Sequence, residues 1–172
     1  DLAEVRYSRS TGLRPALIQF AALVGHRTNS QKYNAEPQVL ILFGVQRALA
    51  LTPYDPYDGG QEADEADAPL STLLAAIMTN GPEVGVHVVI AADHNRSVES
   101  RLGPELLSEM GLRVAGSGAD QRDLAVTSGE YGDIPTPSWG QLLVADTLKG
   151  TVARARGFDI LYQAQTDRSK ES

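Results

Sequence analysis

The sequence predicts a single α/β domain over residues 1–172, with a mostly parallel central sheet and a C-terminal hairpin. Two short runs, Gln38–Phe43 and Val86–Ala92, are apolar on both faces, as in strands buried inside a parallel sheet. Helical patterns alternate with these strands, which is typical of layered α/β folds. Two later strands, Gln141–Val144 and Val152–Phe158, flank a Lys149-Gly150 pair that predicts the hairpin turn.

The N-terminal part predicts one helix before the first buried strand. Val5 and Tyr7 alternate with charged residues, as in a short strand. Pro15 begins a helical pattern with a wide apolar stripe, and the pattern is expected to end at Gly25–Arg27. A short helix is expected between the first buried strand and Leu51.

A long insertion and a second helix follow. Residues 52–69 are rich in Pro, Gly, Asp and Glu and predict an exposed acidic loop. Apolar residues recur at helical spacing from Leu70 to Met78, with Ser71 as the candidate cap. The Asn80–Pro82 segment contains the glycine and proline that stop a helix.

The remaining elements are short. A helix is expected over Val98–Met110, broken into two pieces at Gly103-Pro104. Leu112–Ala115 predicts a third strand and Asp120–Thr127 a short helix. The polar residues 166–172 predict a frayed tail.

Composition limits the function classes. There is no cysteine, which excludes disulfides, thiolate zinc sites and cysteine nucleophiles. The net charge of −7 is unfavourable for a free-standing DNA-binding protein. No apolar run approaches the roughly 20 residues of a membrane span. Because the chain begins at Asp1 without an initiator methionine or a signal-peptide pattern, we expect it to be a segment of a longer protein.

The phosphate-binding loop of P-loop enzymes is absent from the sequence. No G-x-x-x-x-G-K-[ST] or GxGxxG pattern occurs. In a P-loop enzyme, a strand like Gln38–Phe43 ends in an acidic residue that holds magnesium. Here Gly44 and Gln46 follow the strand, so a nucleotide site at this place is expected to be degenerate. The alternative, which the pattern alone favours, is a core strand ending in a turn glycine.

A second polar cluster follows Val86–Ala92. Ligands of parallel sheets bind at the carboxyl ends of the strands, so Asp93, Asn95 and Arg96 are candidates for contacting a γ-phosphate. The alternative is a turn in which an Asx cap starts a helix at Ser97. His26, His87 and His94 lack metal-ligand spacing, and His87 is expected to be a hydrogen-bonded core residue.

Four arginines are candidates for contacting phosphate, DNA or a neighbouring subunit, namely Arg96, Arg113, Arg154 and Arg156. Arg96, Arg101 and Arg113 are candidates for lining one edge of the fold. Arg154 and Arg156 are two residues apart and therefore share one face of a strand, as a phosphate-binding pair would. A solvent-facing strand surface is the alternative that the spacing alone favours.

Taken together, these segments resemble the FtsK/SpoIIIE family of P-loop ATPases over roughly residues 37–158. Four segments show the resemblance, and they occur in the family's order: QVLILFGVQRALAL, NGPEVGVHVVIAAD with its Gly-Val-His strand, ELLSEMGLRVAGSGADQRDL, and SWGQLLVADTLKGTVARARGF as the closing hairpin. The resemblance implies the C-terminal half of a RecA-like three-layer fold. It also implies ATP bound between subunits and ring oligomers that move DNA or export proteins.

Residue by residue, the resemblance assigns Gly44, Gln46 and Arg47 to the Walker B region. It assigns Asp93 and Asn95 to the sensor region. In the second half, Arg113 matches the family's strand arginine, and Arg154 and Arg156 match the closing strand.

The departures from the family are informative. Active members carry an acidic pair where this chain has Gly44 and Val45, a Thr or Gln in the sensor region, and Asp-Ser where Asp120-Gln121 stands. The pattern is similar to non-catalytic modules of tandem members, including EccC-like type VII secretion ATPases. It implies a structural or regulatory module without a catalytic residue or bound metal of its own, with ATP and Mg²⁺ belonging to the longer parent.

The resemblance implies a cytoplasmic location. A tether to the inner membrane through a preceding segment is an open alternative. The implied partners are other modules or subunits of a ring. Two alternative functions stay open. One is a module that docks a secretion substrate or partner subunit, and the other is a DNA-contacting piece of a translocase.

Overall fold

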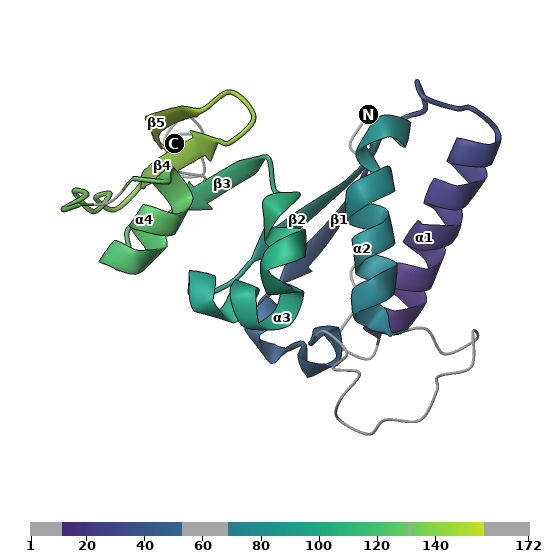
Figure 1. Cartoon of the computed structure of the whole chain (residues 1–172), viewed down its shortest axis with the longest axis horizontal. Helices are drawn as coiled ribbons and strands as arrows, with labels where there is room; N and C mark the ends of the chain where they lie inside the picture. The colour runs from purple at the N-terminus through teal and green to yellow at the C-terminus, as the bar shows by residue number, and fades with distance from the viewer. Residues whose placement is uncertain (1–11, 53–68, 131, 157–172) are drawn as a thin grey trace, which may run out of the picture. The chain divides into compact units, whose positions relative to one another are not determined.

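The computed structural model describes residues 12–52, 69–130 and 132–156. The chain divides into two compact units, Asp1–Glu109 and Met110–Ser172. The first contains a two-stranded parallel sheet and the second a three-stranded antiparallel sheet, which confirms the α/β class (Figure 1). The segment around Val5 and Tyr7, the acidic loop apart from its first and last residues, and the tail lie outside the described residues.

The two strands expected to be buried pair with each other. β1, Gln38–Phe43, lies parallel to β2, Val86–Ala91, in a register that joins Gln38 to Val86 and Phe43 to Ala91. The amide of Gly44 continues the ladder with a 2.8 Å bond to the carbonyl of Ala91. Within the described residues the parallel sheet has these two strands.

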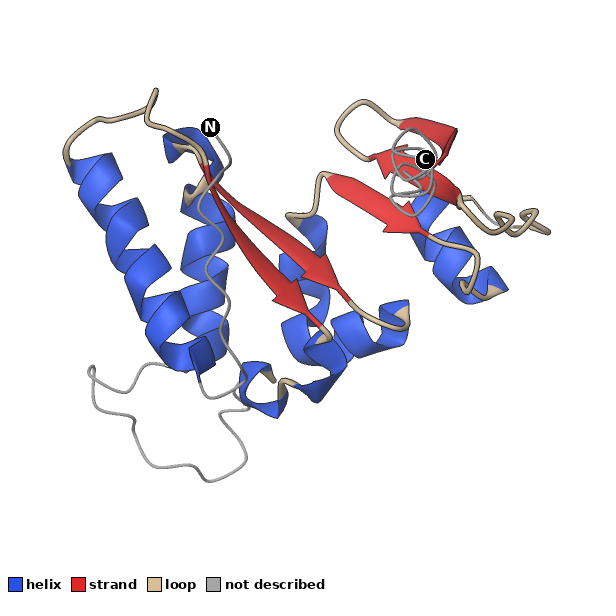
Figure 2. Ribbon diagram, turned by 180° about the vertical axis from the view of Figure 1, so that it is seen from behind, coloured by secondary structure: helices blue, strands red, loops and turns tan. Residues whose placement is uncertain are grey.

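Only one face of this sheet is buried, which corrects the expectation that both faces are. Leu40 and Val86 are buried at 8% and 0% exposure, whereas Ile41 and Phe43 are 64% and 88% exposed. In Figure 1, α2 and α3 lie in front of the strands, and in Figure 2, seen from behind, the strands face the viewer. His87 lies on the uncovered face and is exposed, so it is not the core histidine that its apolar neighbours suggested.

Helix α1, Leu13–Asn29, continues through the glycine that was expected to end it. Gly25 is exposed and a Cβ placed there would meet nothing within 4 Å, so the helix passes this point without strain. The last turn contains Arg27, which is buried at 8% exposure. Its guanidinium donates to the carbonyls of Val84 and Glu36, both at 2.9 Å. Helix α1 ends two residues later in a local turn, in which Gln31 has a φ of 51° and the amide of Lys32 bonds to the carbonyl of Arg27 at 2.9 Å.

Helix α2, Leu70–Asn80, lies beside α1 (Figure 1). Its buried residues Leu70, Leu74, Ile77 and Met78 confirm the predicted apolar face. Pro69 occupies the cap position, so Ser71 lies inside the helix and is not its cap. The helix ends at Gly81, and a short 3₁₀ turn, Pro82–Val84, leads into β2.

The segment after β1 forms two 3₁₀ turns, Val45–Arg47 and Leu49–Leu51, in place of a short α-helix. Helix α3, Asn95–Ser108, follows β2 and is interrupted at Gly103, where φ is 73° and ψ is 168°. The predicted break at Gly103-Pro104 is therefore confirmed. Among the described residues, no helix combines the length and apolar character needed to cross a bilayer.

The second unit is a hairpin-based sheet covered by one helix. β3, Leu112–Ala115, pairs antiparallel with β4, Gln141–Asp146, and β4 pairs antiparallel with β5, Thr151–Arg156. The strand expected to be third in a parallel sheet is thus an antiparallel edge strand. Helix α4, Gln121–Ser128, covers one face of this sheet. The core of the unit contains Ala115, Leu124, Ile134 and Leu143.

Two aspartates hold local turns of this unit, and the second lies at the hairpin turn that the sequence predicted. Asp120 caps α4 by accepting a 2.8 Å bond from the amide of Asp123, whose side chain accepts in return from the amide of Asp120. The hairpin turns at Lys149 and Gly150, where Gly150 has a φ of 62°. The carboxylate of Asp146 closes the turn by accepting from the amides of Leu148 and Lys149.

Candidate functional site

The candidate site is the carboxyl edge of the β1–β2 pair. Because these strands are parallel and in register, the residues that follow them leave the sheet at the same edge. The structure therefore brings Gly44, Gln46 and Arg47 to the edge that also carries Asp93 and Asn95. This is the place at which open α/β sheets bind ligands.

On the β1 side, the chain turns sharply at Gly44, and the polar side chain beside this turn is the uncharged amide of Gln46. Gly44 adopts a left-handed conformation, with φ 74° and ψ 43°, which glycine adopts without steric cost. The amide of Gln46 lies over this glycine, 3.9–4.0 Å from where a Cβ would stand. Arg47 points to solvent as an exposed residue. Residues 38–51 contain no carboxylate, so this side offers no acidic ligand for magnesium.

Arg101 of α3 reaches across to the turn after β1. Its guanidinium donates to the Thr52 hydroxyl at 3.1 Å and to the backbone carbonyl of Gln46 at 3.4 Å. The Arg101 Nε and the Gln46 side-chain oxygen are buried without a hydrogen-bond partner. Sequence reasoning had placed Arg101 among the arginines of an edge, but nothing in the sequence signals its contact with a residue 55 positions away.

On the β2 side, the acidic residue bonds within the turn that enters α3. One carboxylate oxygen of Asp93 accepts from the amide of His94 at 2.9 Å and from the Ser97 hydroxyl at 2.7 Å. The hydrogen bond from Ser97 is the main cause that holds the pKa of Asp93 below its usual value, with a further contribution from the amide of His94. Helix α3 begins at Asn95 with His94 at its cap position, and no side chain bonds to its first amides, so the Asx cap expected at Ser97 does not form.

The carboxylate of Asp93 affects the electrostatics of the site. A helix N-terminus attracts anions because its first amides point outward. Here that carboxylate lies two residues before the first residue of α3, so a phosphate would meet a negative charge. The side chain of Asn95 donates to Glu99 at 2.7 Å, and Arg96 is exposed. Of the β2-side candidates, Asp93 and Asn95 are therefore engaged within α3.

The remaining candidate arginines belong to the second unit. Arg113 donates to the carbonyl of Val126 at 3.0 Å and so ties β3 to α4. Arg154 donates to the carbonyl of Pro135. Its register partner Leu143 is in the core, so Arg154 and Arg156 share the sheet face that α4 covers, as the two-residue spacing predicted. Both arginines are exposed.

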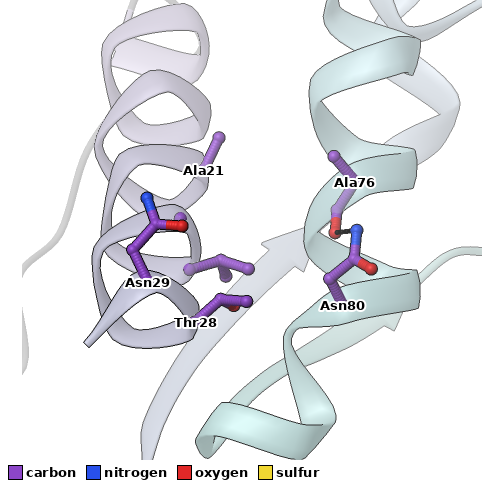
Figure 3. Close-up of a pocket in the computed structure, with 7 residues that line it drawn as sticks. Ala21, Thr28, Asn29, Ala76 and Asn80 are labelled. Carbon is purple, nitrogen blue, oxygen red and sulfur yellow. Dashed lines mark hydrogen bonds between the residues drawn. The ribbon is translucent and has the colours of Figure 1, made fainter. Parts of the chain in front are cut away.

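A separate shallow pocket of about 350 Å³ lies between the last turns of α1 and α2 (Figure 3). Its walls are small side chains and amides, and Asn80 donates within it to the carbonyl of Ala76 at 3.1 Å. Both helices lead from there into the amino ends of the strands, away from the candidate site. The lining contains no titratable side chain, so we assign it no chemistry. The full lining is Ala21, Val24, Gly25, Thr28, Asn29, Ala76 and Asn80.

Comparison with models of known protein families finds no match to this chain, and comparison with curated proteins finds none either.

Proposed function

We propose that the chain is a degenerate, non-catalytic module of an FtsK/SpoIIIE-type motor, built on the C-terminal half of a RecA-like fold. The observation that supports it is the carboxyl edge of the β1–β2 pair. Parallel register brings the two strand ends together, as a nucleotide cleft requires. The β1 end nevertheless carries Gly44, Val45 and Gln46 in place of a carboxylate.

The chemistry of the edge fits a module that shapes a ring or supplies residues to a neighbouring subunit. Phosphoryl transfer needs a cradle for the phosphates, a metal held by acidic side chains and a group that orients the attacking water. The first is absent from the sequence, and the β1 end lacks the second. Asp93, the carboxylate at the β2 end, accepts hydrogen bonds from the Ser97 hydroxyl and the amide of His94. ATP and Mg²⁺ would act in other modules of the parent protein, which is expected to be cytoplasmic.

The proposal is tested by measuring ATP turnover by the purified chain with Mg²⁺. We expect no phosphate release above that of a buffer blank. The matched control is the Asp93→Ala variant, because a contaminating ATPase would leave the rate equal in both proteins. Magnesium-dependent turnover by the wild-type chain that Asp93→Ala abolishes would show a working site and end the proposal.

A second candidate, a protein-interaction module, is favoured by the exposed apolar face of the β1–β2 sheet. Ile41 and Phe43 are 64% and 88% exposed there, which is unusual for strands of a parallel pair. The two candidates differ in their response to nucleotide. Tight nucleotide binding at the carboxyl edge would count against a purely protein-binding role.

A further inference from the structure

Asn80 and Gly81 form the one Asn-Gly pair of the sequence, at the junction between α2 and the turn that enters β2. The other three asparagines, Asn29, Asn34 and Asn95, are followed by Ser, Ala and Arg. An Asn-Gly pair is chemically labile because glycine has no side chain to hinder attack of its backbone nitrogen on the asparagine Cγ. The sequence therefore places its most reactive side-chain amide at this junction.

The reaction of such a pair needs only the two residues and water. The Gly81 nitrogen loses its proton and bonds to the Asn80 Cγ, while the side-chain nitrogen takes up a proton and leaves as ammonia. Water then opens the resulting cyclic imide at one of its two carbonyls. Opening at one carbonyl gives aspartate. Opening at the other gives isoaspartate, in which the main chain runs through the former side chain.

The folded junction withholds the attacking nitrogen. The amide of Gly81 donates a 2.9 Å bond to the carbonyl of Ile77, and the carbonyl of Gly81 accepts a 2.9 Å bond from the amide of Val86. Gly81 is buried, whereas Asn80 is exposed and donates to the carbonyl of Ala76 at 3.1 Å (Figure 3). Water thus reaches the labile side chain, but the nucleophile becomes available only when the end of α2 opens.

The space around Gly81 determines what the reaction does to the fold. A Cβ at Gly81 would press on the carbonyl oxygens of Ile77 and Val86, the latter at 2.6 Å, so the backbone here has no room to shift. Isoaspartate at position 80 lengthens the main chain immediately before this packed glycine. Either product also places a carboxylate in the last turn of α2, where the helix dipole is negative. The modified junction therefore cannot close as the intact one does.

We propose that the Asn80-Gly81 pair is a latent deamidation site that acts as a one-way switch at the α2–β2 junction. The fold protects the pair while the junction is closed. Once the junction has opened, reaction with water makes the opening permanent. The proposal rests on the hydrogen bonds and packing of the first unit and does not depend on the proposed relation to motor ATPases.

The test follows deamidation of the whole purified chain during incubation in mildly alkaline buffer. Peptide mapping by mass spectrometry locates the mass gain of amide-to-acid conversion, and enzymatic methylation of isoaspartate quantifies that product. A synthetic peptide with the sequence of residues 76–86 gives the rate in the absence of a fold. The incubation is repeated at urea concentrations below and above the unfolding transition.

Two variants control for the site and for the charge. Asn80→Gln keeps a neutral amide but needs a larger ring for the same attack, so it should abolish the reaction at this position. Asn80→Asp carries the charge of one product on an unaltered main chain. The aged wild-type forms are separated by chromatography, and their urea unfolding midpoints are compared with that of freshly prepared Asn80→Asp.

We expect Asn80 to deamidate at least about tenfold more slowly in the folded chain than in the peptide, because the rate follows the fraction of open junctions. Urea should raise the rate to that of the peptide, with the other asparagines slower. The isoaspartate form should unfold at lower urea than both the wild type and Asn80→Asp.

Three results would overturn the proposal. The first is an equal rate of deamidation at Asn80 in the folded chain and in the peptide, which would show that the junction gives no protection. The second is faster deamidation in urea at Asn29, Asn34 or Asn95. The third is an isoaspartate form that unfolds at the same urea concentration as the wild type, which would show that the modified junction closes normally.

Discussion

Arg27 shows how one side chain can join parts of the fold that are distant in sequence. It is 8% exposed, and its two terminal nitrogens bond to the carbonyls of Val84 and Glu36. The first bond holds the end of α1 to the turn that enters β2, and the second holds it to the segment that enters β1. A planar guanidinium reaches both carbonyls at once because its donors are fixed in a fork.

Replacing Arg27 by lysine is expected to lower the free energy of unfolding by about 1–3 kcal/mol, because a single ammonium cannot serve both buried carbonyls. Urea unfolding followed by far-ultraviolet circular dichroism measures this loss. The single tryptophan, Trp139, belongs to the second unit and would not report on it. Arg47→Lys at an exposed position is the control and should change stability by less than about 0.5 kcal/mol. Equal stability of the two variants would contradict the bridging role of Arg27.

Asp93 links the stability of the first unit to pH. Its pKa in the folded protein lies below the ordinary value of 3.8, mainly because of the hydrogen bond from Ser97. A depressed pKa means that the ionised form favours folding. Its contribution is therefore complete above about pH 4 and is lost as the pH falls through the folded pKa.

We accordingly expect Asp93→Asn to be less stable than the wild type at pH 7, and the difference to shrink in acid. Urea unfolding at pH 7 and at about pH 3 measures this change. Ser97→Ala should also make stability depend less on pH, as Asp93→Asn does, because it removes the hydrogen bond that lowers the pKa of Asp93 most. A stability difference that stays constant or grows on acidification would show that the hydrogen bonds to Asp93 do not depend on its charge.

At the scale of elements, two glycines of the first unit have opposite roles. Gly25 lies inside α1 with open space around it. Gly81 ends α2, and a Cβ there would press on the backbone oxygens of Ile77 and Val86, the latter at 2.6 Å. Space, and not backbone conformation, makes glycine necessary at Gly81, because its φ of −64° is open to any residue.

Alanine at these two positions should therefore shift stability in opposite directions. Gly25→Ala is expected to raise the free energy of unfolding by about 0.5–1 kcal/mol, because alanine restricts the unfolded chain and favours the helix. Gly81→Ala is expected to lower it by about 2 kcal/mol or more, because backbone atoms must move. Chemical unfolding followed by circular dichroism compares the pair directly. Stabilisation by both substitutions would mean that the α2–β2 junction is looser than described.

Local sequence predicted most of the helices and strands. It predicted less well which of their side chains are buried and which groups those side chains contact. The helix of Leu70–Asn80 and the kink at Gly103 follow from apolar spacing and from glycine and proline, which act over a few residues. The burial of Arg27 did not follow, because its side chain bonds to the carbonyls of Glu36 and Val84, the second 57 residues away. The exposure of Phe43 did not follow either, because a strand's own sequence does not tell which layers are present to cover it.

For the whole molecule, charge is the main guide to partners. The net charge of −7 repels nucleic acid, and Arg154 of the candidate pair already bonds to the carbonyl of Pro135. A DNA-contacting role would have to rely on a local cluster of arginines acting against this charge.

We therefore expect no saturable binding of a labelled 20-base-pair duplex at physiological salt, up to a protein concentration of about 100 µM. Fluorescence anisotropy over a salt series provides the measurement. The Arg154→Ala/Arg156→Ala double variant is the comparison. Binding that falls steeply with salt and is lost in this variant would favour the DNA-contacting function over the one proposed.

The order of the amino acids specified the α/β class, the strands β1 and β2, and the lack of an acid at the end of β1, because these depend on local spacing and on residue identity. Which face of that sheet is exposed, and which carbonyls the buried Arg27 meets, were decided by the tertiary structure. Burial and hydrogen bonding depend on which distant segments meet, and no local pattern records those meetings.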